Sequence, residues 1–340
     1  MKTIILKEPG QFAYADTDLD EQLQPDEALL KVRSIGICGT DYHAFEGNQP
    51  FFSYPRVLGH ELGVEVVAVG SEVTQVKPGD KCSVEPYLNA TQDQAVRNGF
   101  TNCGENISVI GVHEDGGMRE YLKLPARYLH PSATLSYDQL ALVEPLGIGC
   151  HAVNRVKVTA DDYVLVVGAG PIGLAAVQFA TATGAKTVVM DINEGRLAFA
   201  ASVMNIAGTV VAAQDDTVEK IRSHFDGDLP TVVLDATGNQ HSMAKALEYA
   251  APAGRIVFIG LFQGDFTFND PYFHKKELTL MASRNALPAD FKQIIRMMEE
   301  GAIDTDAWIT HRSTFDAMVD TFEFWLKPET QVIKAVVTMD

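Results

Sequence analysis

The sequence contains few cysteines, and this limits the kinds of protein that it can encode. Only four occur in 340 residues, too few and too scattered for a disulfide-stapled secreted domain. Two of them, Cys82 and Cys150, are expected to be ordinary buried thiols. We therefore expect the protein to work in a reducing cytoplasm.

Positive charge is also scarce. The formal net charge is -18, and the acidic residues are spread along the chain without a basic cluster to offset them. Such a chain repels nucleic acid. An anionic small-molecule substrate would need a local basic pocket.

Signals for export or membrane insertion are missing from the pattern as well. The N-terminal residues meet a charge and Pro9 before an apolar signal region of useful length can form. The longest weakly polar stretch, residues 164–183, is long enough to span a bilayer, but it contains a glycine motif that has a better explanation. We expect neither a secretion signal nor a membrane partner.

The length of the chain predicts two domains. Residues 27–37 and 62–69 are rich in β-forming side chains, and a turn at 77–80 follows them, which indicates a β-rich first domain. From Tyr163 onward, strand-like and helical runs alternate, which is typical of a doubly wound α/β domain. The strand-like runs of this second part are 163–167, 187–191, 231–235, 255–260 and 278–283, and the helical runs are 174–183, 195–204 and 243–251.

We place the β-rich first domain at residues 1–150 and the α/β domain at 151–288. A helical run near 290–300 and a strand-like run at 332–338 remain. These have no obvious place in the α/β sheet, so residues 289–340 are expected to return to the first domain.

A glycine motif directly follows the strand-like run 163–167 and opens the next helical run. Its sequence is Gly168-Ala169-Gly170-Pro171-Ile172-Gly173. The first glycine permits a tight turn, the second lets the backbone approach a pyrophosphate, and the third lets helix and strand pack closely. The N-terminus of the helix would then hold the phosphates.

Asp191 ends the next strand-like run, where a carboxylate can accept hydrogen bonds from the ribose hydroxyls of adenosine. A 2'-phosphate would be repelled by that carboxylate, and Arg196 is the only nearby cation. The pattern therefore favours NAD over NADP. The other predicted cofactor contacts are Thr237, Gly260, Ser283 and Arg284.

Four residues suggest a metal site when they are taken together. Cys38, His60, Glu61 and Glu144 are each weak evidence alone, but thiolate, imidazole and carboxylate are the mixed ligands that zinc accepts. A catalytic zinc site keeps one position open for water or substrate. Manganese or another divalent ion stays an alternative, because two of the ligands can be oxygens.

The segments Cys38-Gly39-Thr40-Asp41, Gly59-His60-Glu61 and Glu144-Pro145 carry a family resemblance. Over essentially its full length the chain resembles the zinc-dependent, medium-chain alcohol and polyol dehydrogenases. The resemblance implies a GroES-like β-rich catalytic domain and a Rossmann domain. It also implies one catalytic zinc at Cys38, His60, Glu61 and Glu144, with one glutamate binding directly or through water, and a homodimer or homotetramer.

The resemblance further implies a proton relay through Thr40 and His43. Zinc stabilises an alkoxide as a Lewis acid, Thr40 can take the proton through its hydroxyl, and the imidazole of His43 can pass it to solvent. Two interpretations of Asp41 stay open, namely support for a metal ligand and stabilisation of a turn.

Many relatives hold a second, structural zinc with four cysteines in a lobe after the first ligands. Alignment of that lobe places Ala90, Asp93, Val96 and Gly104 at the four positions. None of them can bind as a thiolate, and Cys103, one position away, cannot close a tetrahedral site alone. We therefore expect no structural zinc.

Within the family, the chain is most similar to bacterial sugar-acid dehydrogenases of the L-galactonate 5-dehydrogenase type. The stretches that carry this likeness are 47–55, 108–113, 237–241, 273–277 and 283–286. The likeness implies oxidation of a secondary hydroxyl of an aldonate. Candidate cations for its carboxylate are Arg284, Lys275 and Arg119, and Phe51, Phe52 and Tyr54 either shape the cleft or simply pack.

Two other functions stay open. One is a dehydrogenase for threonine, a simple alcohol or a phosphorylated polyol. The other is a non-catalytic NAD-binding regulator, since a fold alone does not prove activity.

Overall fold

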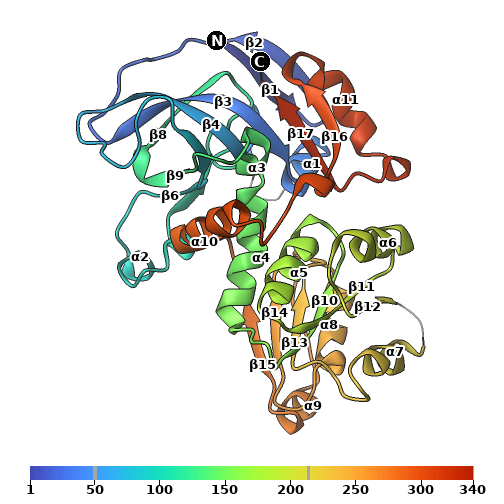
Figure 1. The fold of residues 1–340 in the computed structure, drawn as a ribbon. Coiled ribbons are helices and arrows are strands. Elements are labelled where there is room, and N and C mark those ends of the chain that lie inside the picture. The colour runs from blue at the N-terminus through green and yellow to red at the C-terminus, as the bar shows by residue number, and fades with distance from the viewer. Residues whose placement is uncertain (49–51, 213–214, 340) are drawn as a thin grey trace. The chain divides into compact units, whose positions relative to one another are not determined.

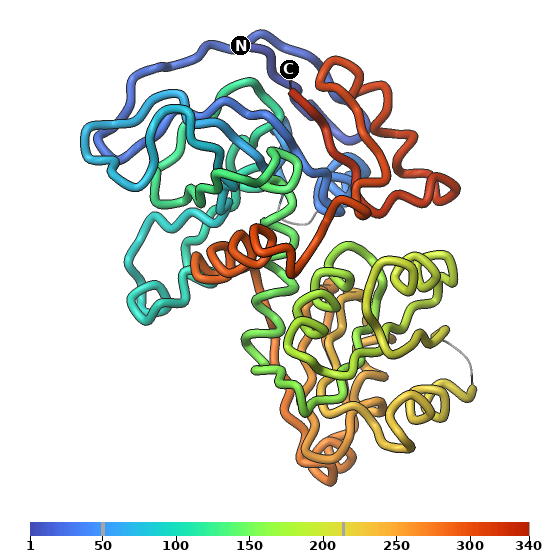
Figure 2. The backbone as a smooth tube through the Cα atoms, in the orientation of Figure 1, coloured from blue at the N-terminus to red at the C-terminus, as the bar shows by residue number. Residues whose placement is uncertain are grey.

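The computed structural model describes residues 1–48, 52–212 and 215–339. The chain divides into two compact units, and the second is inserted into the first. Unit 1 comprises Met1–Pro145 and Leu287–Asp340, and unit 2 comprises Leu146–Ala286. Figure 2 traces the chain as it leaves unit 1 in green and returns to it in orange-red. The first change of unit comes before residue 150, because helix α4 (Val143–Val156) begins in unit 1 and continues into unit 2.

Unit 1 is built on a seven-stranded, mainly antiparallel sheet with the order β16-β17-β3-β4-β5-β9, in which β8 also pairs with β3. The position of β17 beside β3 places a C-terminal strand in the middle of an N-terminal sheet. The strands are β3 (Glu27–Ile37), β4 (Glu61–Val69), β5 (Lys81–Val84), β8 (Tyr121–Pro125), β9 (Leu129–Pro131), β16 (Ile309–Thr314) and β17 (Lys334–Thr338).

Smaller elements complete unit 1. Two further pairs of strands are β1 (Lys2–Glu8) with β2 (Gln11–Asp16) and β6 (Tyr87–Asn89) with β7 (Ile107–Val109). The α-helices are α1 (Gly39–Phe45), α2 (Gln94–Arg97), α3 (Tyr137–Ala141), α10 (Pro288–Glu299) and α11 (Met318–Trp325), together with the start of α4.

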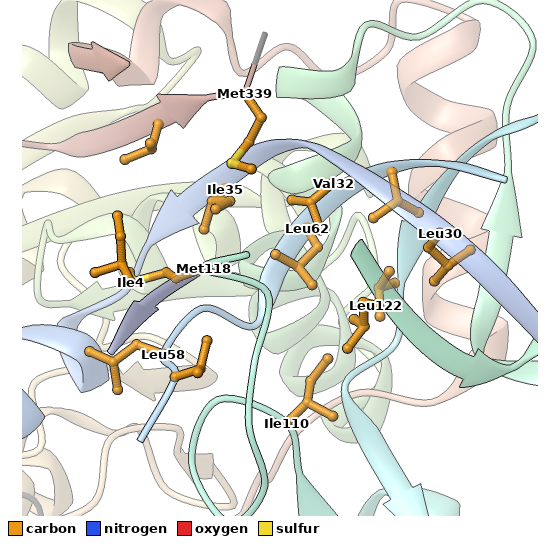
Figure 3. Close-up of a cluster of buried hydrophobic side chains, with 14 of the residues drawn as sticks. Ile4, Leu30, Val32, Ile35, Leu58, Leu62, Ile110, Met118, Leu122 and Met339 are labelled. Atoms are coloured by element: carbon orange, nitrogen blue, oxygen red, sulfur yellow. The ribbon is translucent and has the colours of Figure 1, made fainter. Parts of the chain in front are cut away.

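The core of unit 1 gathers apolar side chains from strands that are distant in sequence. Figure 3 shows Ile35 of β3 and Leu62 of β4 among them, with Ile4 and Met118 close by. These side chains are fully or almost fully buried. Because this core carries β3 and β4, it fixes the ends of the two strands from which the site described below is built.

Unit 2 contains a six-stranded parallel sheet with the order β12-β11-β10-β13-β14-β15. This order, with its reversal beside β10, defines a doubly wound Rossmann domain, and it confirms the expected fold class. The strands are β10 (Tyr163–Val167), β11 (Lys186–Asp191), β12 (Gly208–Val211), β13 (Val232–Asp235), β14 (Arg255–Phe258) and β15 (Thr279–Ala282). The α-helices are α5 (Pro171–Ala182), α6 (Glu194–Val203), α7 (Thr217–His224), α8 (Gln240–Tyr249) and α9 (Asp270–Lys275), together with the rest of α4 (Figure 1).

The stretch 164–183 has the structure that the glycine motif predicts. It divides into β10 and the 12-residue helix α5, joined by the glycine loop. In the described part of the chain, no helix combines the length and the apolar character that a membrane crossing requires.

Candidate active site

Three of the four predicted metal ligands come together in unit 1. One ligand atom each from Cys38, His60 and Glu61 lies within 4.8 Å of the others. Cys38 directly follows β3 and precedes α1, whereas Glu61 begins β4. Since β3 and β4 pair antiparallel with Gly36 opposite Glu61, the end of one strand meets the beginning of the other. The sheet register therefore builds this cluster.

Glu61 needs a gap in the neighbouring strand. A Cβ atom on Gly36 would lie 2.1 Å from Glu61 Oε2 and 2.9 Å from its Cβ, so only glycine leaves room for this side chain. Beyond Gly36, on β17, the Lys334 ammonium donates hydrogen bonds to Glu61 Oε1 at 2.7 Å and to Oε2 at 2.9 Å. It also donates to the carbonyl of Ile37 at 3.1 Å. The glutamate is thus held from two neighbouring strands.

Asp41 stabilises the turn into α1 and also lies close to His60. Its Oδ2 accepts a hydrogen bond from the backbone N–H of Cys38 at 2.8 Å, which stabilises the turn into α1. Its Oδ1 lies 3.9 Å from Nδ1 of the buried His60. A carboxylate near the imidazole orients the ring and raises its basicity.

Glu144, the fourth predicted ligand, lies in the first turn of α4. It is buried, and its Oε1 accepts a hydrogen bond from the hydroxyl of Tyr87 on β6. It lies outside the group formed by Cys38, His60 and Glu61. The negative charge of Glu144 nevertheless helps to raise the pKa of His60.

Burial and crowding of like charges perturb the titration of this cluster. Burial raises the pKa of Asp41 and of Glu144, and in both cases the nearby Glu61 adds to the shift. Burial opposes the charged form of His60, but Cys38 and Asp41 raise its pKa well above the ordinary value. Burial also opposes the charged form of Lys334, whose pKa is nonetheless raised by Glu61 and Cys38. The acidic groups thus favour a positive charge among them.

The donor set fits a divalent ion such as zinc. Sulfur, nitrogen and oxygen donors converge in it, as zinc accepts. The ammonium of Lys334 lies near three acidic side chains, those of Cys38, Glu61 and Glu144. Asp41 Oδ1 and His60 Nδ1 are buried without a hydrogen-bond partner among the described residues. Unpaired polar atoms at this depth are consistent with a site that a cation would complete.

The two predicted relay residues share α1. Thr40 is half-buried and lies in the first turn of the helix, next to the cluster in sequence. His43 lies one turn later and is exposed, with its Nδ1 3.9 Å from Glu46 Oε2. Positions three apart lie on one face of a helix, so Thr40 and His43 share a face of α1 on which His43 is the more exposed.

In unit 2, each glycine of the motif has the backbone environment that its predicted role needs. Gly168 has φ of +100°, which a residue with a side chain rarely adopts. A Cβ on Gly170 would meet nothing within 4 Å, so its backbone is open to approach, whereas one on Gly173 would lie 1.7 Å from the carbonyl oxygen of Gly168. Pro171 and Ile172 form the first turn of α5, where Gly170 is the N-cap.

Asp191 lies at the end of β11, beside this loop. Its Oδ2 accepts a hydrogen bond from the backbone N–H of Ala169 at 2.6 Å, and its Oδ1 accepts one from Asn193 at 2.8 Å. Each carboxylate oxygen keeps a second lone pair for a ribose hydroxyl. Arg196, in contrast, lies on the exposed side of α6.

The other predicted cofactor residues follow the carboxyl ends of β13, β14 and β15, where ligands of doubly wound sheets bind. Thr237 donates to Asp235 Oδ1, and Gly260 has no room for a Cβ, which would lie 2.1 Å from the nitrogen of Gly238. The hydroxyl of Ser283 is buried without a partner among the described residues. Arg284, next to it, is exposed.

The predicted substrate residues are less uniform. Arg119 is largely buried, which lowers its pKa, and its Nη2 donates to the carbonyl of Asp115. Lys275 is exposed at the end of α9. Phe52 and Tyr54 form an edge-to-face pair with ring centroids 4.9 Å apart and pack against the core of unit 1, as the packing interpretation expects. Gln49, Pro50 and Phe51 lie outside the described residues.

The lobe between β6 and β7 is held by a carboxylate at one of the four positions aligned with structural-zinc cysteines. Asp93 Oδ1 accepts from the N–H of Val96 at 3.1 Å, and its Oδ2 accepts from the N–H of Glu105 at 2.7 Å. A Cβ on Gly104 would meet Asp93 Oδ2 at 3.2 Å, and Cys103 is exposed. These hydrogen bonds join the two ends of the lobe.

Three residues around the cluster were missed by sequence reasoning, namely Gly36, Tyr87 and Lys334. Gly36 is a glycine inside a strand run, and such a glycine often marks a close approach. Tyr87 and Lys334 carry no local signal, because the contacts of both depend on pairing between distant segments.

Comparisons with known proteins agree with this architecture. Residues 24–134 match the family model described as alcohol dehydrogenase GroES-like domain, and residues 171–300 match the one described as zinc-binding dehydrogenase. The chain is 43% identical to L-galactonate-5-dehydrogenase of Escherichia coli K12 over 99% of both proteins. It is 32% identical to L-arabinitol 4-dehydrogenase of Aspergillus oryzae, covering 92% of this chain and 86% of that protein. An alcohol dehydrogenase from E. coli CFT073, solved with NADH, superposes with a TM-score of 0.92 at 28% identity over 99% of both chains.

Proposed function

Since the chain belongs to the zinc-type, medium-chain alcohol and polyol dehydrogenases, and is thus an oxidoreductase acting on CH–OH donors, we propose that it oxidises a secondary hydroxyl of a sugar acid or polyol to the keto product with NAD. An L-galactonate-like aldonate is the leading substrate. The convergence of the half-buried Cys38 with the buried His60 and Glu61 in one cluster carries this proposal.

The cluster would hold one catalytic zinc through Cys38, His60 and Glu61, with Glu144 binding directly or through water. When bound, the ion supplies a positive charge that stabilises the oxygen of the substrate hydroxyl as its proton leaves. Asp41 keeps the His60 imidazole oriented, and Lys334 keeps Glu61 in place. We propose no second, structural ion, because hydrogen bonds from the N–H groups of Val96 and Glu105 to Asp93 already hold the lobe together.

Thr40 and His43 would carry the proton away. The hydroxyl of Thr40 can accept a proton and donate its own, and the exposed imidazole of His43 can release it to solvent. Their shared face on α1 supports this order, with Thr40 nearer in sequence to Cys38 and His43 toward water.

NAD is the proposed hydride acceptor. Gly168, Gly170, Pro171, Ile172 and Gly173 would bind the pyrophosphate, while Asp191 would bind the adenosine ribose and disfavour a 2'-phosphate. Arg196 is positioned on the neighbouring helix and would not outweigh that carboxylate. Thr237, Gly260, Ser283 and Arg284 would line the rest of the cofactor path.

The named activity of the 43% identical relative supports the choice of an aldonate. Its carboxylate would need a cation, for which Arg284, Lys275 and Arg119 are the candidates. The exposed Arg284 follows the carboxyl end of β15, where ligands of such sheets bind, which makes it the first to test. We further propose that the enzyme acts in the cytoplasm as a homodimer or homotetramer, without nucleic-acid or membrane partners.

The decisive experiment is a panel of aldonates, polyols, threonine, simple alcohols and phosphorylated polyols, each assayed with NAD and with NADP by absorbance of the reduced nicotinamide. The proposal expects turnover of an aldonate or polyol with NAD. Turnover of threonine or a phosphorylated polyol alone would replace the substrate class. Binding of NADH by metal-loaded protein without turnover of any alcohol would favour the regulator. Elemental analysis should find one zinc per chain, and two would contradict the role given to the lobe.

A further inference from the structure

The hydroxyl of Tyr87 contacts Glu144, the predicted metal ligand that lies outside the group of Cys38, His60 and Glu61. Tyr87 is 2% exposed and Glu144 is 5% exposed, so water reaches neither side chain appreciably. The hydroxyl donates to Glu144 Oε1, and it is the hydrogen-bond donor that the structure gives this carboxylate among the described residues. A buried carboxylate without a donor bears a large desolvation cost. The hydrogen bond from Tyr87 therefore offsets part of the cost of burying the Glu144 carboxylate.

The ring of Tyr87 is itself held firmly. It meets the ring of Phe291 on α10 edge to face, with centroids 6.4 Å apart, and Phe291 stacks on His130 at 4.7 Å. His130 Nε2 in turn lies 2.9 Å from Glu85 Oε2, two residues before Tyr87. The hydroxyl is consequently presented from a fixed position and not from a mobile surface side chain.

The carboxylate of Glu144 lies among charged groups of both signs. Glu61 repels the Glu144 carboxylate, whereas His60 and Lys334 attract it. A buried carboxylate under such opposed forces can rotate unless a donor restrains it. Restraint by a hydroxyl leaves the charge on the carboxylate and keeps its second oxygen available.

We propose that Tyr87 is a positioning residue for the cation site: its hydroxyl fixes the Glu144 carboxylate beside Cys38, His60 and Glu61, and in this way it sets how tightly the site holds its ion. The inference rests on the proposed metal site. It assigns to a residue of β6 a role beyond packing, although Tyr87 itself need not touch the ion.

Tyr87→Phe separates this role from a structural one, because it removes the hydroxyl and keeps the ring against Phe291. The matched control is Tyr128→Phe. Tyr128 lies in the same unit and is also buried. Its hydroxyl accepts a hydrogen bond from the backbone N–H of Asn89, which Tyr128→Phe removes. Loss of a residue that orients a metal ligand typically weakens metal binding about 10–100-fold. We expect that loss in Y87F and wild-type zinc affinity in Y128F.

The measurement is competition for zinc between the holoenzyme and a chromophoric chelator, repeated in a Glu144→Gln background. If the hydroxyl acts through the Glu144 carboxylate, Y87F weakens zinc binding in the wild type and changes it less than about twofold in E144Q. An equal loss in both backgrounds would overturn the proposal. The proposal would also be overturned if zinc-free Y87F had a much lower unfolding temperature than zinc-free Y128F, since a packing defect would then explain the weaker zinc binding.

The outcome also distinguishes this inference from the proposed function. A wild-type protein that retains no zinc or other divalent ion would remove the proposed function itself. A wild-type protein that retains zinc, with Y87F and Y128F indistinguishable from it, would remove only the role of Tyr87. NADH affinity serves as an internal check and should not change in either variant.

Discussion

Lys334 and Glu61 are 273 positions apart, yet the ammonium of Lys334 donates hydrogen bonds to both carboxylate oxygens of Glu61, at 2.7 and 2.9 Å. Both side chains are at most 3% exposed. The contact runs from β17 to β4 past Gly36 of β3, the strand between them. It ties the last strand of unit 1 to the predicted metal site.

Lys334→Met should strongly destabilise unit 1, because it leaves the buried Glu61 carboxylate without its counter-charge. Breaking a buried ion pair from one side costs about 3–5 kcal/mol. Urea unfolding of the metal-free protein measures this loss, and the exposed Lys245 provides a neutral control as Lys245→Met. In the double variant with Glu61→Leu, much of the stability should return while zinc binding stays lost. A single variant as stable as the control would show that the pair contributes little.

Gly36→Ala should displace Glu61, since the new methyl group would overlap the carboxylate and its stem. We expect zinc affinity to fall about 10–100-fold, as for other losses of ligand orientation. Gly39→Ala is the matched control, because a Cβ there meets nothing within 4 Å. Chelator competition compares the two proteins. Equal affinities in G36A and G39A would mean that Glu61 does not need the gap.

Asp191→Ser should weaken the binding of NAD and reduce the preference of the enzyme for NAD over NADP. The substitution removes a charged acceptor for the ribose hydroxyls, and hydrogen bonds to charged groups contribute about 1.5–3 kcal/mol, which corresponds to roughly a 10–100-fold fall in kcat/KM for NAD. The exposed Asp161 of the same unit provides the control as Asp161→Ser. Steady-state kinetics with both cofactors decide the matter, and an unchanged ratio of NAD to NADP activity would argue against the role of Asp191.

The lobe between β6 and β7 should loosen in acid. Hydrogen bonds from the N–H groups of Val96 and Glu105 lower the pKa of Asp93. A carboxylate whose folded pKa lies below its unfolded value of about 3.9 stabilises the fold fully above that value, and this contribution is lost as the pH falls through the folded pKa. The protection of the Val96 and Glu105 amides against hydrogen exchange, taken relative to the intrinsic exchange rate at each pH, should therefore fall at low pH.

In Asp93→Asn the protection factors of the same two amides should already be lower at neutral pH, with little further change on acidification. Glu105→Gln is the control, because the hydrogen bond of Asp93 with that residue is to its backbone N–H. A protection factor at Val96 that depends on pH as strongly in D93N as in the wild type would assign the effect to another group.

Local sequence patterns predicted the parts of the molecule that depend on neighbouring residues. The glycine motif follows β10 and opens α5 as expected, because a tight turn, an open backbone and a close packing contact each require glycine within six positions. The predicted strand at residues 27–37 coincides with β3. The return of the C-terminal segment to the first unit was inferred only because it had no place in the α/β sheet.

The residues that contact the predicted metal ligands could not be predicted in the same way. Lys334 meets Glu61 only because β17 pairs with β3 in one particular register, with Ala335 opposite Ile37, and no short pattern encodes that register. Tyr87 belongs to a strand of three residues, and its hydrogen bond to Glu144 depends on where α4 begins. For Asp41 the sequence offered two alternatives. In the structure one carboxylate oxygen stabilises the turn and the other lies 3.9 Å from His60 Nδ1, so support for a metal ligand stays a prediction.

The place of β17 also bears on how the protein is made. A ribosome releases β3 and β4 early, but the segment of β3 that pairs with β17 has to wait until all of unit 2 and most of the remaining chain have been synthesised. Domains with contiguous sequences can fold while translation continues, and unit 2 meets that condition. Until β17 is synthesised, β3 of the nascent first unit lacks its pairing partner on that edge, and Glu61 lacks the lysine with which it pairs in the folded unit.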